Sequence, residues 1–325
     1  MATLVSRPSA SSEPSPGYMP HDVELARLDS SSSPSLLSAP PPYDDAPANP
    51  SAFHPTVHFQ IETRGKRWLS FPSPTRPDPI PVFALHPSDS SACASTSLTT
   101  PAYISHRPER SSGSCYLTTP LSPTTPLATT TYRFGPGRPA RMRLFHPAST
   151  SSLTPSTLQA LLSSKDEETP SVEPWDDFPL TSLGLLTRAL AFRTRLGTFE
   201  WRYASRRERA ALSPPDTVVS SLLVLERVVR VATAGRKKDE EIRTPVAQLI
   251  RGEGYRADGS GASDAGNGGR LVLDLGMWED EDQKGEREMV QVLAVATCLV
   301  MLKREVDRRR AQQMAIIAGA VSGGS

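Results

Sequence analysis

The sequence predicts a mainly β protein in which an antiparallel β-barrel encloses a hydrophobic α-helix near the C-terminus. Residues 289–302 (MVQVLAVATCLVML) form an apolar run of fourteen residues with charged residues on both sides. Short segments that alternate apolar and polar residues, separated by Pro, Gly and Ser, precede this run. A helix that is apolar on every face needs burial all round, and a closed sheet supplies a lumen without free edges. We therefore expect the helix to pass through the barrel.

The predicted helix covers residues 286–310, and only Gln291 and Thr297 interrupt its apolar run. At about 1.5 Å per residue the run is about 21 Å long, which is short for a bilayer span of about 20 apolar residues. Met289, Cys298 and Met301 are expected to pack in the core rather than line a lipid pocket. The positions expected to form the helix core are Val292, Leu293, Val295, Ala296, Leu299 and Val300.

The strands are predicted from period-two alternation and from β-branched or aromatic residues between turn formers. Val57, Phe59 and Ile61 alternate with polar residues and begin the ordered part of the chain. The strands expected before the middle of the chain are 57–61, 67–71, 80–85, 102–105, 115–118, 131–134 and 141–145. Those expected after it are 197–204, 218–231, 246–250 and 270–275. Such short, regularly spaced segments favour a meandering antiparallel sheet.

Segments rich in Pro, Ser, Thr and Gly interrupt this pattern. Residues 1–51 contain too little apolar surface to offset the entropy of ordering, and we predict a disordered arm. The barrel domain is expected over 52–310, with disordered insertions at about 87–100, 149–174 and 252–269. The second insertion carries a short helix expected at 156–163. Residues 311–325 are expected to be a C-terminal tail.

Composition excludes several classes of function. The chain has 36 basic and 35 acidic residues in a total of 325, so no bulk charge favours binding to nucleic acid or to a membrane. Cys93, Cys115 and Cys298 are odd in number and widely spaced, which fits a reducing compartment rather than a disulfide frame. The N-terminus lacks the apolar core of a secretory signal. We expect a cytoplasmic protein, with nuclear or peripheral membrane locations as alternatives.

Three features together resemble a known family. They are the FEWR sequence at residues 199–202, a glycine-bounded strand at 269–275, and a late helix that ends in KREVDRRR at 303–310. Over residues 53–310 the chain resembles the tubby C-terminal-like superfamily, and more narrowly its uncharacterised fungal members. These are similar to phospholipid scramblases and LURP-one-related proteins. The resemblance implies a barrel around a hydrophobic helix, and tubby itself implies phosphoinositide binding through basic side chains.

A short motif in the arm points to a protein partner. Pro40, Pro41, Pro42 and Tyr43 form a PPxY sequence. Consecutive prolines preform a polyproline II helix, so docking into the aromatic groove of a WW domain costs little entropy. A WW-domain ubiquitin ligase or adaptor is the expected partner. The alternative is a chance string within a Pro-rich tract.

An arginine-rich segment is a candidate site for anionic phospholipid. Its residues include Arg188 and, as the predicted patch, Arg193, Arg195, Arg202, Arg206, Arg207, Arg209, Arg236, Lys237 and Lys238. Each basic residue near an anionic leaflet contributes about 1 kcal/mol to binding, so convergence of several would give salt-sensitive attachment. The alternative is a solvated strand rim, because alternate strand residues point to opposite faces.

No motif for catalysis, cofactor or metal is found. Gly252 and Gly254 lack the third glycine of a dinucleotide turn, and no phosphate-binding loop is present. His54 and His58 would lie about 13 Å apart on a strand, too far to share a metal. The acidic run at 279–282 lacks the ligand spacing of an EF-hand. The Ser-Pro and Thr-Pro pairs, such as Ser122-Pro123, are either phosphorylation sites or plain linker.

The leading hypothesis is a non-enzymatic binding module. It would recruit a WW-domain protein through the arm and bind anionic phospholipid through the barrel. The alternatives are a lipid-handling protein of scramblase type and a hydrolase without a recognisable motif.

Overall fold

The structure is a computed structural model. It describes residues 53–67, 78–86, 100–108, 113–132, 138–146, 162, 173–184, 187–213, 218–232, 240–280 and 283–322. These all belong to one compact unit, Asn49–Ser325. The predictions for the arm, for the PPxY motif, for most of the insertions at 87–100 and 149–174, and for residues 236–238 lie outside the described residues.

Among the described residues, twelve strands close into a barrel. Each strand pairs antiparallel with the next along the chain, and β1 pairs with β12 to complete the ring. The strands are β1 Val57–Ile61, β2 Ile80–Leu85, β3 Tyr103–His106, β4 Cys115–Thr119, β5 Ser122–Thr131, β6 Ala140–Leu144, β7 Asp176–Ser182, β8 Leu190–Thr194, β9 Gly197–Tyr203, β10 Val219–Val231, β11 Glu240–Gly252 and β12 Gly269–Leu273. This arrangement confirms the predicted fold class.

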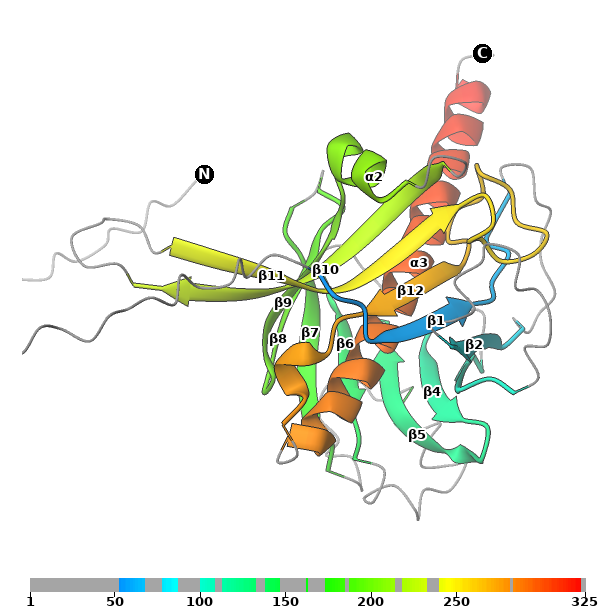
Figure 1. Cartoon of the computed structure of the whole chain (residues 1–325). Helices are drawn as coiled ribbons and strands as arrows, with labels where there is room; N and C mark the ends of the chain where they lie inside the picture. The colour runs from blue at the N-terminus through cyan, green and yellow to red at the C-terminus, as the bar shows by residue number, and fades with distance from the viewer. Residues whose placement is uncertain are drawn as a thin grey trace, which may run out of the picture. The chain divides into compact units, whose positions relative to one another are not determined.

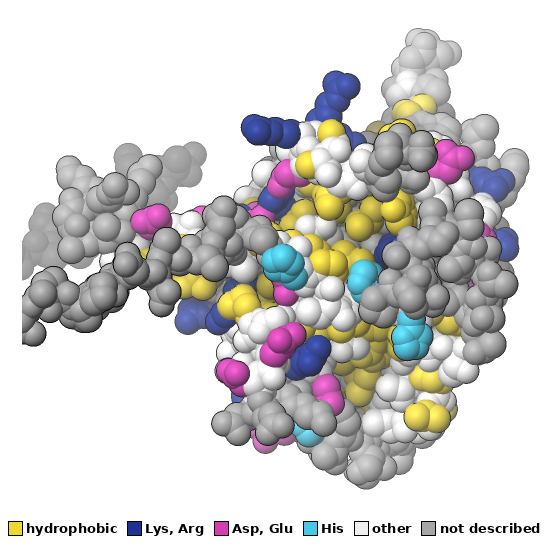
Figure 2. All heavy atoms as spheres, in the orientation of Figure 1, with side chains coloured by type: hydrophobic (Ala, Val, Ile, Leu, Met, Phe, Trp, Pro, Cys, Tyr) yellow, Lys and Arg dark blue, Asp and Glu magenta, His cyan; other side chains and the backbone are white. Residues whose placement is uncertain are grey.

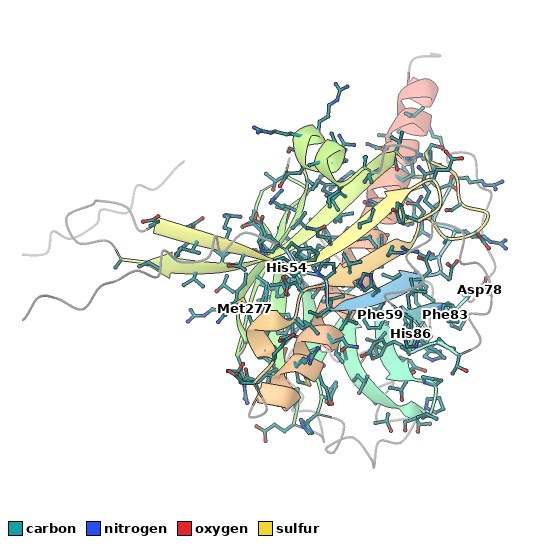
Figure 3. All side chains as sticks on the ribbon, in the orientation of Figure 1. His54, Phe59, Asp78, Phe83, His86 and Met277 are labelled. Carbon is teal, nitrogen blue, oxygen red and sulfur yellow. The ribbon has the colours of Figure 1, made fainter. Side chains whose placement is uncertain are left out.

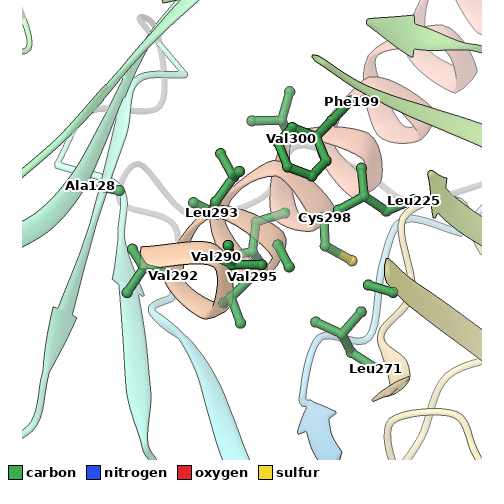
Figure 4. Packing of buried hydrophobic residues seen from close by; sticks show 14 of the residues in the cluster. Ala128, Phe199, Leu225, Leu271, Val290, Val292, Leu293, Val295, Cys298 and Val300 are labelled. Atoms are coloured by element: carbon green, nitrogen blue, oxygen red, sulfur yellow. The ribbon is translucent and has the colours of Figure 1, made fainter. Parts of the chain in front are cut away.

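The helix α3 (Lys284–Ser322) passes through the barrel. Figure 1 shows it running from the end of the barrel opposite α2 to the end at which α2 lies. Inward side chains of the strands enclose its apolar run, and all six helix positions named from the sequence are buried. Figure 4 shows this packing, with helix side chains beside Ala128, Phe199, Leu225 and Leu271.

The two polar residues within the apolar run each have a partner in the barrel wall. Trp201 Nε1 donates a hydrogen bond of 2.8 Å to Thr297 Oγ1, and that hydroxyl donates to the Leu293 carbonyl at 2.7 Å. Gln291 Nε2 donates to Tyr103 Oη at 3.0 Å. A buried polar group without a partner would cost free energy, so these bonds favour one rotation of the helix within the lumen.

Strand prediction was correct where the alternating pattern was clear and wrong around the prolines. β1 and β2 match the predicted ranges, and the strand predicted at 131–134 overlaps β5 only at Thr131. Residues 133–134, and residues 68–71 of the strand predicted at 67–71, lie outside the described residues. β5 runs through the Ser-Pro and Thr-Pro pairs, and Pro126 lies opposite Thr118 at a shift in the strand register. Proline is tolerated at such irregularities because no regular ladder bond is required there.

Three elements were not predicted. β7 and β8 complete the middle of the barrel, and Pro179 within β7 pairs with Arg141. The helix α2 (Arg206–Leu212) follows β9 directly. Its start has a capping box, in which Ser205 and Glu208 bond reciprocally to each other's backbone N–H.

Two predicted boundaries also differ from the structure. Residues 252–269, expected to be a disordered insertion, form successive turns that are tied to the barrel by a bridge between Lys66 and Ala265. Asn267 in this segment is buried, so tertiary contacts order a sequence whose composition favoured flexibility. The expected tail at 311–325 instead continues α3 as far as Ser322.

Candidate functional site

The arginine patch predicted from the sequence is divided between the two ends of the barrel. Arg193 lies on β8 and Arg195 in the turn before β9. Arg202 is near the other end of β9, and α2 follows with Arg206, Arg207 and Arg209. A strand of seven residues is about 20 Å long, so the two groups do not converge. Figure 2 shows basic side chains projecting over α2 at the top of the view.

Arg202 is paired with carboxylates and therefore links elements rather than offering a free charge. Its guanidinium bonds to Glu226 Oε1 at 2.6 Å and to Glu208 Oε1 at 2.7 Å. The hydrogen bond from Arg202 is the main cause that lowers the pKa of Glu208 to about 2. These bonds join β9, β10 and α2 at the barrel end from which α3 leaves.

A buried ion pair holds α3 at the same end. Both terminal nitrogens of Arg251, at the end of β11, donate to the carboxylate of Glu305 on α3, each at 2.7 Å. The Arg251 side chain is only 4% exposed. Burial alone would raise the pKa of Glu305, but the hydrogen bonds and charge of Arg251 outweigh it and hold that pKa below its usual range. No local sequence pattern indicates this pair, because its two residues are 54 positions apart.

Further hydrogen bonds complete this network. Tyr203 Oη donates to Glu305 Oε1, and the Gly266 N–H donates to Oε2 at 2.9 Å. Gly266 has a φ of 71°, and a Cβ there would lie 2.5 Å from the Leu302 carbonyl oxygen, so the position requires glycine. Arg251 also donates to Asn267 Oδ1 at 3.1 Å and to Ser221 Oγ at 2.8 Å. The network therefore ties strands β9–β11 and the 252–269 segment to α3.

Two adjoining pockets open above this network, and we call this end of the molecule the barrel mouth. One pocket has a volume of about 250 Å³ and the other about 630 Å³. They share four lining residues, Arg188, Tyr203, Ser220 and Ser221. Six arginines line them, compared with the two carboxylates Asp264 and Glu305. The arginines are Arg188, Arg202, Arg209, Arg251, Arg308 and Arg309.

Three of these arginines contact uncharged groups. The Arg188 guanidinium lies over the Tyr203 ring, 5.4 Å from its centroid. Arg209 Nη1 donates to the Ser220 carbonyl at 2.7 Å, and Arg309 Nη2 donates to the Ser263 carbonyl at 2.9 Å. The contacts of Arg188 and Arg209 position a guanidinium without neutralising it. The barrel mouth is therefore positively charged and suited to an anion with several oxygen acceptors, such as a phosphate group.

None of the histidines that the structure describes lines the two pockets. The His54 backbone N–H donates to Asp274 Oδ2 at 2.8 Å, and Figure 3 shows His86 beside Phe83 on the β2 side, away from His54. Within the described ranges, no group of three or more His, Cys, Asp or Glu residues is arranged to hold a metal ion. Across the same ranges, no helix is both long and apolar enough to cross a membrane.

The fold and the site define a closed antiparallel barrel of twelve strands around a C-terminal helix, with an arginine-lined mouth. Comparison of the chain with protein-family models, with curated proteins and with solved structures gave no match.

Proposed function

We propose that this protein is a non-enzymatic binding module of the tubby-like barrel type, which attaches to anionic phospholipid through the barrel mouth. The observation that carries the proposal is the convergence of Arg188, Arg209, Arg308 and Arg309 from separate parts of the chain on two adjoining pockets. A guanidinium matches the oxygen pairs of a phosphate and can bind them bidentately. The barrel around a hydrophobic helix supports the resemblance to tubby-like proteins.

The geometry narrows the predicted lipid patch. Arg193 and Arg195 lie at the opposite end of the barrel and are excluded from the proposed site. Arg202 is retained as a structural residue because Glu208 and Glu226 bind it. Arg209 stays in the site, and Arg188, Arg308 and Arg309 join it, whereas Arg251 is structural because Glu305 binds it. Arg206 and Arg207 on the exposed side of α2 would add attraction at longer range.

Co-sedimentation with vesicles tests this proposal. We expect the protein to pellet with vesicles that contain phosphatidylinositol phosphates at low salt, and to bind pure phosphatidylcholine far less. Substitution of Arg188→Gln together with Arg308→Gln should weaken binding about 30-fold, because each lost charge near the leaflet costs about 1 kcal/mol. The matched control is Arg193→Gln with Arg195→Gln, which removes the same charge from the far end and should change binding less than about twofold.

Two results would contradict the proposal. One is equal binding to anionic and uncharged vesicles. The other is an equal loss of binding in the mouth variant and the control variant, which would show that only the overall charge matters. Thermal melting of each variant checks that the barrel remains folded.

The proposal also assigns partner recruitment to Pro40, Pro41, Pro42 and Tyr43. A fluorescent peptide that covers residues 36–47 should bind a WW domain of the type that reads PPxY. Tyr43→Ala should weaken that binding at least about tenfold, or about 1.4 kcal/mol, since the tyrosine fills a side pocket of the groove. A peptide of the same composition in scrambled order is the control. Equal binding by the wild-type and Tyr43→Ala peptides would remove this part of the proposal.

A further inference from the structure

The C-terminal part of α3 extends beyond the barrel. Figure 1 shows the helix continuing past α2 and the ends of β10 and β11. Met314, Ile316 and Ile317 in this part are 64%, 57% and 57% exposed. Together with Ala315 and Ala318 they form an apolar segment that we call the α3 tip, residues 314–318.

The α3 tip is apolar on every side rather than along one stripe. Its five consecutive residues cover more than one helical turn, because a turn takes about 3.6 residues. A helix that docks in a protein groove shows an apolar face and a polar face. Hydrocarbon surrounds an inserted helix end and accepts apolar side chains in all directions. The presence of apolar side chains on all sides of the α3 tip therefore favours a lipid surface over a protein groove as its binding partner.

A basic and polar collar lies directly below the tip. Arg308, Arg309 and Gln312 on α3 line a pocket at the barrel mouth, and Arg310 follows on the same helix. Between Arg309 and Met314, the first residue of the tip, the helix rises about 8 Å. The polar layer on each side of a bilayer is about 5–8 Å thick. When the tip reaches the hydrocarbon, the arginines of the mouth therefore lie at the depth of the lipid phosphates.

We propose that the α3 tip inserts into the hydrocarbon of an anionic membrane and orients the barrel with its mouth against the headgroups. This inference rests on the proposed function of the mouth, because the arginines supply the attraction that brings the tip to the surface. Charge and apolar insertion together give more stable attachment than either contribution alone. The tip is inserted from one side and does not cross the membrane.

A fluorescent probe at the tip tests insertion directly. The environment-sensitive dye NBD is attached through Ile317→Cys in a chain that carries Cys93→Ser, while Cys115 and Cys298 remain in the barrel. The control carries the dye at Leu121→Cys, which is 93% exposed in the turn between β4 and β5 at the opposite end. Vesicles contain phosphatidylinositol phosphates in phosphatidylcholine, with spin-label quenchers either on the headgroup or within the acyl chain.

Insertion predicts a blue shift of the Ile317→Cys probe on anionic vesicles and stronger quenching from the acyl chain than from the headgroup. The Leu121→Cys probe should show neither change. A bound protein whose tip probe is unshifted and unquenched would overturn the inference and leave the lipid-binding mouth intact. Absence of binding to anionic vesicles would overturn both.

A second variant distinguishes the contribution of the α3 tip to vesicle affinity from that of the arginines. Ile316→Ser with Ile317→Ser should lower vesicle affinity about tenfold or more, because two exposed apolar side chains no longer enter the hydrocarbon. Its residual binding should keep the salt dependence of the wild type, whereas Arg188→Gln with Arg308→Gln should reduce that dependence. Unchanged affinity in the serine variant would contradict insertion. Equal melting of this variant and the wild type confirms that the barrel is folded.

Discussion

Leu299→Asp should abolish the folded barrel. Leu299 is 7% exposed on the part of α3 that lies inside the lumen, among apolar side chains of the barrel wall. An unpaired carboxylate there loses its hydration, at a cost of several kcal/mol. Because the whole domain is expected to be stable by only about 5–15 kcal/mol, we expect the cooperative thermal transition in near-ultraviolet circular dichroism to disappear or to shift strongly downwards.

The same helix offers a matched control. Ile317→Asp places the same charge eighteen positions further along α3, where the side chain is 57% exposed beyond the barrel. A surface substitution of this kind changes stability by about 0.5 kcal/mol or less. A soluble Leu299→Asp protein that melts like the wild type would contradict the position of the helix inside the barrel.

Glu305→Gln should destabilise the protein by about 3–5 kcal/mol, because it leaves the buried guanidinium of Arg251 without its counter-charge. Arg251 is buried beside Asn267 and Ser221, and Glu305 supplies the carboxylate of its ion pair. The free energy of unfolding, measured with guanidinium chloride, gives the effect. The control is Asp307→Asn, which loses the same charge from a side chain that is 42% exposed and pairs with Lys303, and it should cost less than Glu305→Gln because water reaches this carboxylate.

A double replacement gives a sharper result. Arg251→Met with Glu305→Leu removes both charges and should recover most of the stability lost in Glu305→Gln, since apolar residues of similar size can replace a buried ion pair. If the Glu305→Gln and Asp307→Asn variants are equally stable, the buried pair does not hold the helix. If the double variant is no more stable than Glu305→Gln, packing rather than the unpaired charge explains the loss.

The acid stability of the wild type provides a second measure of the same pair. The pKa of Glu305 is lower in the folded protein than its usual 4.5, so its contribution is complete above that value and is lost as the pH falls through the folded-state pKa. Glu208, whose folded-state pKa is about 2, also contributes stability that is lost as the pH falls. We therefore expect stability to fall below pH 4.5 in the wild type, and to fall less in Glu305→Gln.

Local sequence patterns were sufficient for the elements whose environment is simple. Alternation of Val57, Phe59 and Ile61 predicts β1 because one face of that strand packs on the core and the other does not. The pattern fails at β5 and β7, where prolines interrupt it and pairing with neighbouring strands maintains the extended chain. It also fails at residues 252–269, where the glycine-rich composition suggests flexibility but contacts with Lys66 and Glu305 impose order.

The candidate site could be predicted from the sequence less completely than the fold. The spacing of Ser205 and Glu208 is typical of a capping box and is a sequence signal for the start of α2. Nothing comparable pointed to Arg251 and Glu305, which are 54 positions apart, or to Tyr203, which is 102 positions from Glu305. Their contact depends on where β11 ends relative to the exit of α3.

The sequence by itself determined that a helix of unbroken apolar character must be enclosed and that strands precede it to form the enclosure. This follows because hydrophobic burial depends on the composition of a segment and on its period. Only the tertiary structure decided which arginines share a surface. Arg193 and Arg202 lie in one β-hairpin and are separated by the length of β9, whereas Arg188 and Arg309 are distant in sequence and line one pocket. The local sequence does not determine at which end or on which face of the barrel a charged strand residue lies. Closure of the barrel determines both.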